Sequence, residues 1–221
     1  MEQVRRIRPT RRSVSGVYMF RGEAAVEFES TLERDFIAHA EFSCSVLKVI
    51  PQPCRIAYLA PSGRRQTYTP DFLVLYRAGT RCSDGPSTPM LVEVKPEAEW
   101  RQHWRKWLPK WKAAHAYARE QGWIFHIRDE SRIRNQALKN IHFLNRYKRM
   151  TFPPEESRAV IAMVEQVGTV TAHHLLEACF MVSHRPQGIA HLWHLLAIRM
   201  LDCDISQPLS NLTELWIPDE K

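Results

Sequence analysis

The sequence predicts an α/β protein in which a mixed sheet is flanked by helices and a smaller, mainly helical domain follows. A strand, a long helix and a second strand succeed one another over residues 90–127, which is the pattern of parallel strands joined by a helical crossover. Beyond residue 150, three helical segments follow in close succession. We therefore expect a basic N-terminal arm (1–22), a first domain (23–150) and a C-terminal domain (151–221).

The composition is that of a globular protein. The chain is 44% hydrophobic with a mean hydropathy of −0.37, and it has no apolar run of the roughly 18 residues that a membrane span requires. Its N-terminal arginines are not followed by an apolar segment, so we expect no signal peptide and a cytoplasmic protein. The five cysteines are widely spaced and form no CxxC pair, which disfavours both disulfides and zinc sites.

The net charge of +7 is unevenly placed. Residues 1–150 hold 27 Lys and Arg against 15 Asp and Glu, whereas residues 151–221 hold 4 against 9. A basic region suits nucleic acid, because neutralised phosphates release counterions. We expect the acidic C-terminal region to meet a protein instead. Two solvated surfaces without partners would also account for these charges.

The first fifteen residues are polar, lack apolar periodicity and predict a flexible basic arm. The arm could lie along a phosphate backbone, or it could be a disordered tail that only aids solubility. Its basic residues are Arg5, Arg6, Arg8, Arg11 and Arg12.

A helix is expected over residues 23–42, because Phe28, Leu32 and Phe36 recur at four-residue intervals. Within it, Ser30 and Glu33 form an S-x-x-E capping box.

Segments rich in β-branched and aromatic residues predict the strands of the sheet. Pro61-Ser62-Gly63 is a turn, which makes the strands on either side of it an antiparallel hairpin. Residues 80–89 form a loop before the next strand. The expected strands are 46–50, 55–60, 66–76, 90–95 and, after a helix, 123–127.

The helix between the last two strands begins near Pro96 and ends at Gly122, and Pro109 is expected to kink or break it. One face carries four tryptophans, which more often belong to a core than to a base-stacking platform. An adjacent basic stripe could face DNA or water, and Arg101 and Arg105 are its candidate DNA-binding residues. The tryptophans are Trp100, Trp104, Trp107 and Trp111.

A closing helix is expected over residues 132–149, followed by a linker at 151–154. Helical patterns then cover 155–167, 172–179 and 188–200, and short alternating pieces over 201–217 predict a hairpin. Three helices and a hairpin are typical of a winged helix. The histidines of this region lack zinc-ligand spacing and are expected to be ordinary helix residues.

The most informative residues are Asp71, Glu93 and Lys95. Glu93 and Lys95 share one face of a strand, and Asp71 lies beside the neighbouring strand, so the two carboxylates are expected to meet across a divalent metal. Mg²⁺ prefers oxygen ligands, to which the Val94 carbonyl would contribute. The metal would stabilise charge at a phosphate, and Lys95 would position water or neutralise the phosphorane. A solvated strand face is the alternative for Glu-x-Lys alone.

Glu33 is the fourth candidate, because a helix packed on this sheet could present one more carboxylate as a metal or water ligand. A capping-box glutamate needs no further function, and Glu29, one turn earlier, competes for the same role.

These residues occur in an order that resembles the TnsA endonuclease subunit of heteromeric transposases. The resemblance covers about residues 25–150, and the tail is more loosely similar to the C-terminal domain of that family. It rests on Glu29-Ser30-Thr31-Leu32-Glu33-Arg34-Asp35-Phe36, Gln52-Pro53, Tyr68-Thr69-Pro70-Asp71-Phe72 and Val92-Glu93-Val94-Lys95-Pro96.

The resemblance implies a restriction-endonuclease-like core, a winged-helix-like C-terminal domain and a bacterial protein that acts at the nucleoid. It implies Mg²⁺-dependent cleavage, with Mn²⁺ as a substitute, of the 5′ strands at transposon ends. A DDE transposase (TnsB) would process the 3′ strands, and the tail would dock on an AAA+ regulator (TnsC). Glu33, Asp71, Glu93 and Lys95 match the catalytic positions. The alternatives are a stand-alone restriction or repair nuclease and a catalytically silent DNA-binding scaffold.

Overall fold

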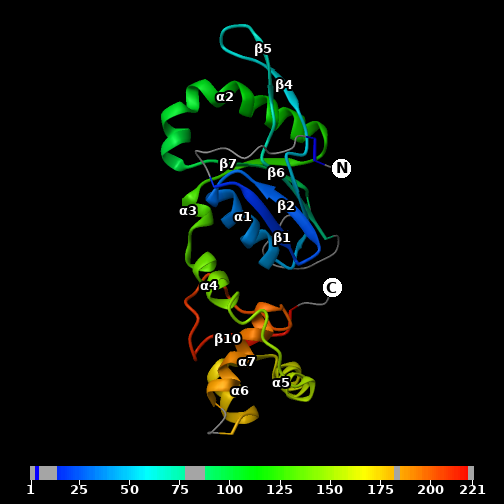
Figure 1. Ribbon diagram of the computed structural model, residues 1–221, viewed down its shortest axis with the longest axis vertical. Coiled ribbons are helices and arrows are strands. Elements are labelled where there is room, and N and C mark those ends of the chain that lie inside the picture. Colours follow the sequence, from blue (N-terminus) through cyan, green and yellow to red (C-terminus); the bar gives the residue numbers. More distant parts are fainter. Residues whose placement is uncertain (1–2, 5–13, 78–87, 182–184, 219–221) are drawn as a thin grey trace. The chain divides into compact units, whose positions relative to one another are not determined.

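The computed structural model describes residues 3–4, 14–77, 88–181 and 185–218 (Figure 1). The chain divides into two compact units, residues 1–134 and 135–221. This boundary lies earlier in the chain than the one expected after residue 150, because residues 135–150 contact the C-terminal part of the chain.

The first unit is built on a four-stranded mixed sheet. Its strand order is β3-β6-β7-β8, in which β3, β6 and β7 pair antiparallel and β7 pairs with β8 in parallel. Strands β7 and β8 precede and follow helix α2 along the chain, and their parallel pairing confirms the expected crossover. The bounds are Val46–Pro51 for β3, Phe72–Tyr76 for β6, Met90–Val94 for β7, Ile124–Arg128 for β8 and Glu97–Glu120 for α2.

Strand β7 is buried along its whole length, and its side chains alternate between the two faces of the sheet. Both faces must therefore be covered, and helices cover them. Met90, Val92 and Val94 pack in the cluster that includes α1 (Thr31–Phe42). Leu91 packs in the opposite cluster, which includes Trp111 of α2. Glu93 has the same parity as Leu91 and therefore lies on the α2 side.

The hairpin predicted around Pro61-Ser62-Gly63 is present as β4 (Ile56–Leu59) and β5 (Arg65–Tyr68), paired antiparallel. The single strand expected over 66–76 is instead two strands, β5 and β6. Thr69-Pro70-Asp71 separates them, since a proline has no N–H to donate to a sheet ladder. The hairpin can therefore leave the main sheet and pack against α2.

The helix expected over residues 23–42 is wrong over its first eight residues. Residues 16–28 form a hairpin of β1 (Gly16–Phe20) and β2 (Ala24–Phe28), and α1 begins only at Thr31. Arg21 and Gly22 turn the chain with φ values of 53° and 75°. Val26 and Phe28 are buried two residues apart, so the apolar spacing that suggested a helix belongs partly to a strand.

The proposed basic arm falls mainly outside the described residues. This includes its arginines Arg5, Arg6, Arg8, Arg11 and Arg12. The end of the expected arm, from residue 16, is instead strand β1 of the first unit.

Helix α2 continues without a break through Pro109, and Figure 1 shows that its axis bends. An interior proline costs a helix about 3 kcal/mol. Packing beyond it offsets that cost, since Trp111, Ala114 and Ala118 are buried against the sheet. Of the tryptophan stripe, Trp111 is buried in the core, Trp100 and Trp107 are partly buried against it, and Trp104 is 45% exposed.

The closing helix expected over 132–149 is interrupted. It forms α3 (Glu130–Ile133) and α4 (Gln136–Leu144), separated at Arg134, whose backbone is not helical. The side chain of Asn135 accepts a hydrogen bond from the Leu138 N–H and so caps α4.

Helix α4 belongs to the second unit. Its Asn140 amide donates to the carbonyls of Ile205 and Gln207 at 2.8 and 2.6 Å. Farther along, the Tyr147 carbonyl contacts the His194 ring at 2.9 Å. These contacts tie residues 135–150 to the C-terminal helices.

The second unit contains α5 (Pro154–Val167), α6 (Ala172–Cys179) and α7 (Arg185–Ala197). The expected terminal hairpin is reduced to one bridge between Asp202 and Trp216. The last strand, β10 (Glu214–Trp216), pairs instead with β9 (Thr169–Thr171), which lies between α5 and α6. The sequence missed β9 because three residues carry too little periodicity.

The new boundary changes the charge of the second unit. Residues 135–150 contain four basic residues and no acidic ones, so residues 135–221 hold 8 Lys and Arg against 9 Asp and Glu. The second unit is therefore close to neutral, and only its part after residue 150 is acidic.

His191 is fully buried in the second unit, where it stacks on Phe152 at 4.3 Å and contacts the Ser157 hydroxyl at 2.8 Å. It is a core residue, as expected of these histidines. The four cysteines among the described residues are free. None of the described helices has the length and apolarity needed to cross a membrane.

We predict that Leu91→Ala destabilises the first unit by about 2–5 kcal/mol, because it leaves a cavity at a fully buried position of a central strand. Urea denaturation followed by circular dichroism measures this loss. Leu47→Ala is the matched control, since Leu47 is 52% exposed, and it should change the unfolding free energy by less than about 0.5 kcal/mol.

Candidate active site

Asp71 immediately precedes β6 and lies opposite Glu93, which is near the end of β7. Phe72 pairs with Val92 in the β6–β7 ladder, so the antiparallel register places Asp71 beside Glu93. The Val94 N–H donates to Asp71 Oδ2 at 2.7 Å, which fixes the carboxylate against β7. The predicted meeting of the two carboxylates therefore follows from sheet register.

Gln52 holds the backbone of Asp71 from the other side. Its N–H donates to the Asp71 carbonyl at 2.7 Å, which extends the β3–β6 ladder past Pro51. Gln52 has a φ of 44°, an uncommon conformation for a residue other than glycine. The Gln52-Pro53 element thus positions the acid that follows β5.

Glu93 is 2% exposed, and both of its oxygens are engaged. The Tyr68 hydroxyl donates to Oε2 at 2.6 Å, and the Lys110 ammonium donates to Oε1 at 3.0 Å. The Lys95 ammonium lies 3.9 Å from the same Oε1. A buried carboxylate is thus held by one neutral donor and two cations.

Burial raises the pKa of Asp71 well above its ordinary value, and the charges of Glu93 and Glu33 raise it further. The charge of Lys95 and the Val94 hydrogen bond oppose this rise without cancelling it. Two acids close together in a poorly solvated place disfavour each other's ionisation. Such a pair gains from any cation that enters between them.

Lys95 responds in the opposite way. Burial lowers its pKa, but the charges of Asp71, Glu93 and Glu33 outweigh burial and leave the pKa raised. Lys95 therefore remains an ammonium across the neutral range.

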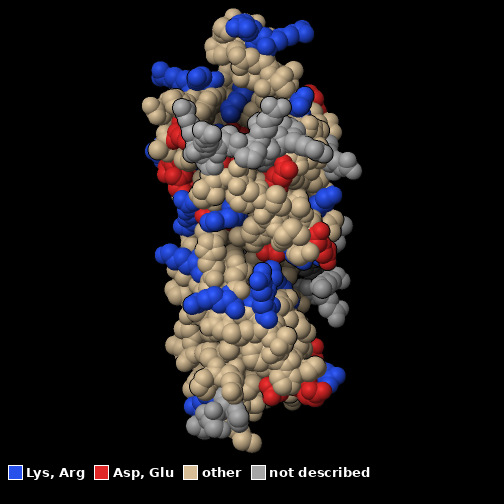
Figure 2. Space-filling model, viewed as in Figure 1, with Lys and Arg blue, Asp and Glu red and all other residues tan. Residues whose placement is uncertain are grey.

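A cleft of about 650 Å³ opens over this group. The β4–β5 hairpin lines one side, and Lys106, Trp107 and Lys110 of α2 line another. Figure 2 shows Lys and Arg side chains gathered around the hairpin and α2. A basic, partly aromatic cleft over an acidic centre fits an extended polyanion better than a small neutral ligand.

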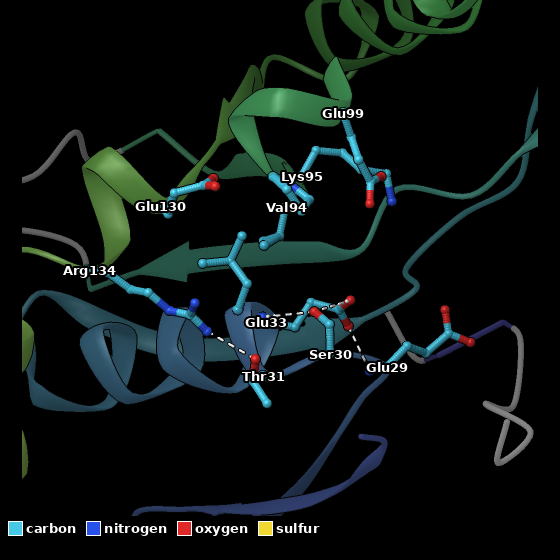
Figure 3. A pocket seen from close by; sticks show the side chains of 11 residues that line it. Glu29, Ser30, Thr31, Glu33, Val94, Lys95, Glu99, Glu130 and Arg134 are labelled. Atoms are coloured by element: carbon cyan, nitrogen blue, oxygen red, sulfur yellow. Dashed lines mark hydrogen bonds between the residues drawn. The ribbon is translucent and has the colours of Figure 1, made fainter. Parts of the chain in front are cut away.

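Glu33 is placed differently. It lies in the first turn of α1. Its Oε1 accepts a hydrogen bond from the Ser30 hydroxyl, and its Oε2 accepts one from the Glu29 N–H (Figure 3). The expected capping box is present, because Ser30 Oγ also accepts from the Glu33 N–H. Burial raises the pKa of Glu33, and these hydrogen bonds lower it in part.

Glu33 lines a smaller hollow of about 380 Å³, which is also lined by Lys95, just after β7, and by Glu99, in the first turn of α2 (Figure 3). Glu29 lines both this hollow and the cleft over Asp71 and Glu93. Glu33 acts on the central pair through its charge, whereas Glu29 borders the cleft itself. Glu29 precedes the Ser30 N-cap, so Glu33 is the carboxylate that α1 itself carries.

Arg101 lies away from this centre. It forms an ion pair with Glu97 at 2.6 Å and lines a separate hollow beside Trp100, Trp104 and Asp129. The Arg105 guanidinium lies over the Trp104 ring. The basic stripe of α2 that borders the cleft is instead Lys106 and Lys110.

Among the described residues, no three His, Cys, Asp or Glu side chains come together as a ready metal site. Mg²⁺ commonly takes only one or two carboxylates and completes its shell with water and phosphate oxygens. Asp71 and Glu93 supply such a pair, and both line the cleft that phosphate and water can enter. The donor set fits a hard divalent cation.

Sequence reasoning missed Tyr68 and Lys110. Tyr68 belongs to the motif that ends in Asp71, and only the register of the hairpin shows that its hydroxyl reaches Glu93. Lys110 lies three residues after Trp107 on a helix with several other basic residues, and nothing in its spacing distinguishes it from them.

Comparison with protein families gives two matches. Residues 43–130 match the family described as TnsA-like endonuclease N terminal, and residues 132–205 match the one described as TnsA endonuclease C terminal. The first match contains Asp71, Glu93 and Lys95 and begins after Glu33. No curated protein matches the chain.

We predict that Asp71→Asn stabilises the protein in the presence of EDTA. Since the folded pKa of Asp71 lies above the unfolded value, stability falls as pH rises from about 4 through the folded pKa. A neutral side chain escapes this loss. The unfolding free energy of the variant should exceed that of the wild type at pH 8, and the difference should shrink as the pH is lowered toward 4.

Asp35→Asn provides the contrast for this measurement. Asp35 is also buried, but it is ion-paired with Arg134 at 2.9 Å, so its neutralisation should lower stability at pH 8. Equal effects of the two substitutions in urea titrations would contradict the account of Asp71.

Proposed function

The chain belongs to the TnsA endonuclease family, a family of DNA endonucleases, and from this premise we propose that it is the Mg²⁺-dependent subunit of a cut-and-paste transposase that cleaves the 5′ strands at transposon ends. Family membership implies a restriction-endonuclease-like fold, and the mixed sheet with helices on both faces is consistent with it. The observation that carries the proposal is the group of Asp71, Lys95 and the buried Glu93, which line one cleft together with Lys106 and Lys110 of α2.

In this proposal Asp71, Glu93 and the Val94 carbonyl hold the metal, and Mn²⁺ substitutes for Mg²⁺. When bound, the metal lowers the pKa of a water and polarises the phosphate. Glu33 or Glu29 orients water from the start of α1. These assignments rest on the donor set and on the family pattern.

Lys95 stays protonated and faces the centre from the strand end, 3.9 Å from Glu93. Its ammonium is suited to neutralise charge that builds on the non-bridging oxygens of the scissile phosphate. A fixed cation next to developing charge, in a poorly solvated place, typically accelerates such a reaction about 10²–10³-fold.

DNA would enter the cleft between the β4–β5 hairpin and α2, where Lys106 and Trp107 offer phosphate and sugar contacts. We propose Arg101 and Arg105 as contacts to the backbone farther along α2. The five arginines of the N-terminal arm would lie along the same duplex.

We propose that residues 135–221 form a winged-helix-like unit that docks on an AAA+ regulator (TnsC-like), while a DDE transposase (TnsB-like) cuts and joins the 3′ strands. The order helix, strand, two helices, bridge and strand supports a winged helix. The charge of this unit supports partner binding less than the sequence suggested, because only its part after residue 150 is acidic.

A stand-alone restriction or repair nuclease is the second candidate. It is favoured by one observation, that the Asp71, Glu93 and Lys95 group lies entirely within one unit of the chain. A silent scaffold does not fit the membership in an endonuclease family.

We predict that Lys95→Ala reduces 5′-strand cleavage at least about 100-fold in a reaction reconstituted with the transposase partner, because it removes the cation beside the phosphate. Binding to the partner should persist in a pull-down. Lys48→Ala, an exposed lysine of β3, is the matched control and should cleave as the wild type does. Full cleavage by the Lys95 variant would overturn the mechanism.

We predict further that the purified chain with Mg²⁺ leaves supercoiled DNA intact and cuts only when a TnsB-like partner and transposon ends are added. A gel assay for nicked product measures this. Nicking by the chain alone, lost in Asp71→Ala, would favour the stand-alone nuclease.

A further inference from the structure

Lys110 is an additional cation in direct contact with the acidic centre. It lies in α2, and its Nζ donates to Glu93 Oε1 at 3.0 Å, closer than the Lys95 Nζ at 3.9 Å. Its side chain is only 15% exposed. The proposed catalytic set is therefore incomplete without it.

Three aromatic rings surround this ammonium. Its distances to the ring centroids are 4.6 Å for Tyr68, 5.0 Å for Trp107 and 5.8 Å for Trp111. Ring faces attract a cation without a covalent or hydrogen-bonding constraint on its position. The rings can therefore hold the ammonium near the site without fixing it on Glu93.

In the protein without metal, two ammonium groups already lie against one oxygen of Glu93. Lys110 Nζ is 3.0 Å and Lys95 Nζ 3.9 Å from Glu93 Oε1. A divalent cation that binds Glu93 meets an ammonium on the same oxygen and is repelled by it. Metal binding is then favourable only if one ammonium withdraws or a phosphate brings in negative charge.

We propose that Lys110 is a displaceable counter-ion of Glu93, which weakens metal binding in the DNA-free protein and transfers to a DNA phosphate when substrate enters the cleft. The cleft that Lys110 lines is the one open to DNA, so the transfer needs only a side-chain movement. The inference rests on the proposed metal-dependent function. It makes DNA and metal bind cooperatively and discourages cleavage before both are present.

Lys110→Met tests this proposal, because methionine keeps an apolar stem against the rings and removes the charge. Electron paramagnetic resonance of Mn²⁺ with the full chain, free of DNA, should give a dissociation constant roughly tenfold lower than for the wild type, as for the loss of a competing charge-assisted hydrogen bond. Affinity for duplex DNA in Ca²⁺, followed by fluorescence anisotropy, should fall. A Lys110 with only a structural role would not move these two affinities in opposite directions.

Two matched variants complete the experiment. Lys106→Met removes a charge from the same cleft one turn away, so it should weaken DNA binding and leave the Mn²⁺ affinity unchanged. Lys110→Arg keeps the charge and should retain the weak Mn²⁺ binding of the wild type. Circular dichroism confirms that each variant folds.

The outcomes separate this inference from the proposed function. If the wild type binds Mn²⁺, Asp71→Ala does not, and Lys110→Met binds no more tightly than the wild type, the role of Lys110 is overturned and the metal site stands. Tighter binding by Lys110→Met, or binding by that variant alone, supports the role. Absence of Mn²⁺ binding in the wild type and in every variant overturns both.

Discussion

The structure of the first unit depends on one constraint, which is that two carboxylates are buried side by side between a sheet and a helix. Burial raises the pKa of Asp71, and the neighbouring charge of Glu93 raises it further. Isolated buried charges are not tolerated, so cations must be supplied. Lys95 supplies one from the strand and Lys110 supplies another from α2.

Much of the surrounding fold can be understood as support for this pair. Pro70 ends the hairpin and lets β6 start a new ladder, while Gln52 and Val94 hold Asp71 by its carbonyl and its carboxylate. The β4–β5 hairpin brings Tyr68 to the second oxygen of Glu93. A group fixed by two backbone hydrogen bonds and one tyrosine hydroxyl is preorganised, as phosphate chemistry in a metal site requires.

The candidate centre and the cleft over it lie within the first unit. In the proposed function, the second unit contributes partner binding and no residue of the centre. In the proposed transposase, control would then come from access: partners present the DNA, and Lys110 holds the metal site in a less receptive state until a phosphate arrives. Coupled metal and DNA binding gives such control without a large conformational change.

The sequence by itself indicated the candidate site residues and most of the sheet. Strand alternation places Glu93 and Lys95 on one face, because alternation is a local rule of backbone geometry. The division of the strand expected over 66–76 into β5 and β6 at Pro70 was seen only in the structure. The β1–β2 hairpin escaped prediction because Phe28, the last residue of β2, also begins the four-residue spacing with Leu32 and Phe36 that indicated a helix. The assignment of α4 to the second unit was not predicted, because it depends on contacts between residues far apart in the sequence, such as that of Asn140 with Ile205.

Only the tertiary structure decided which side chains complete the centre. Glu33 and Glu29 could not be ranked from spacing, and the fold engages Glu33 in its capping hydrogen bonds while Glu29 borders the cleft. Lys110 is one lysine among several along α2, and the packing of α2 on the sheet alone selects it as the partner of Glu93. Spacing specifies a face of a helix or strand, whereas contact between elements depends on how those faces pack.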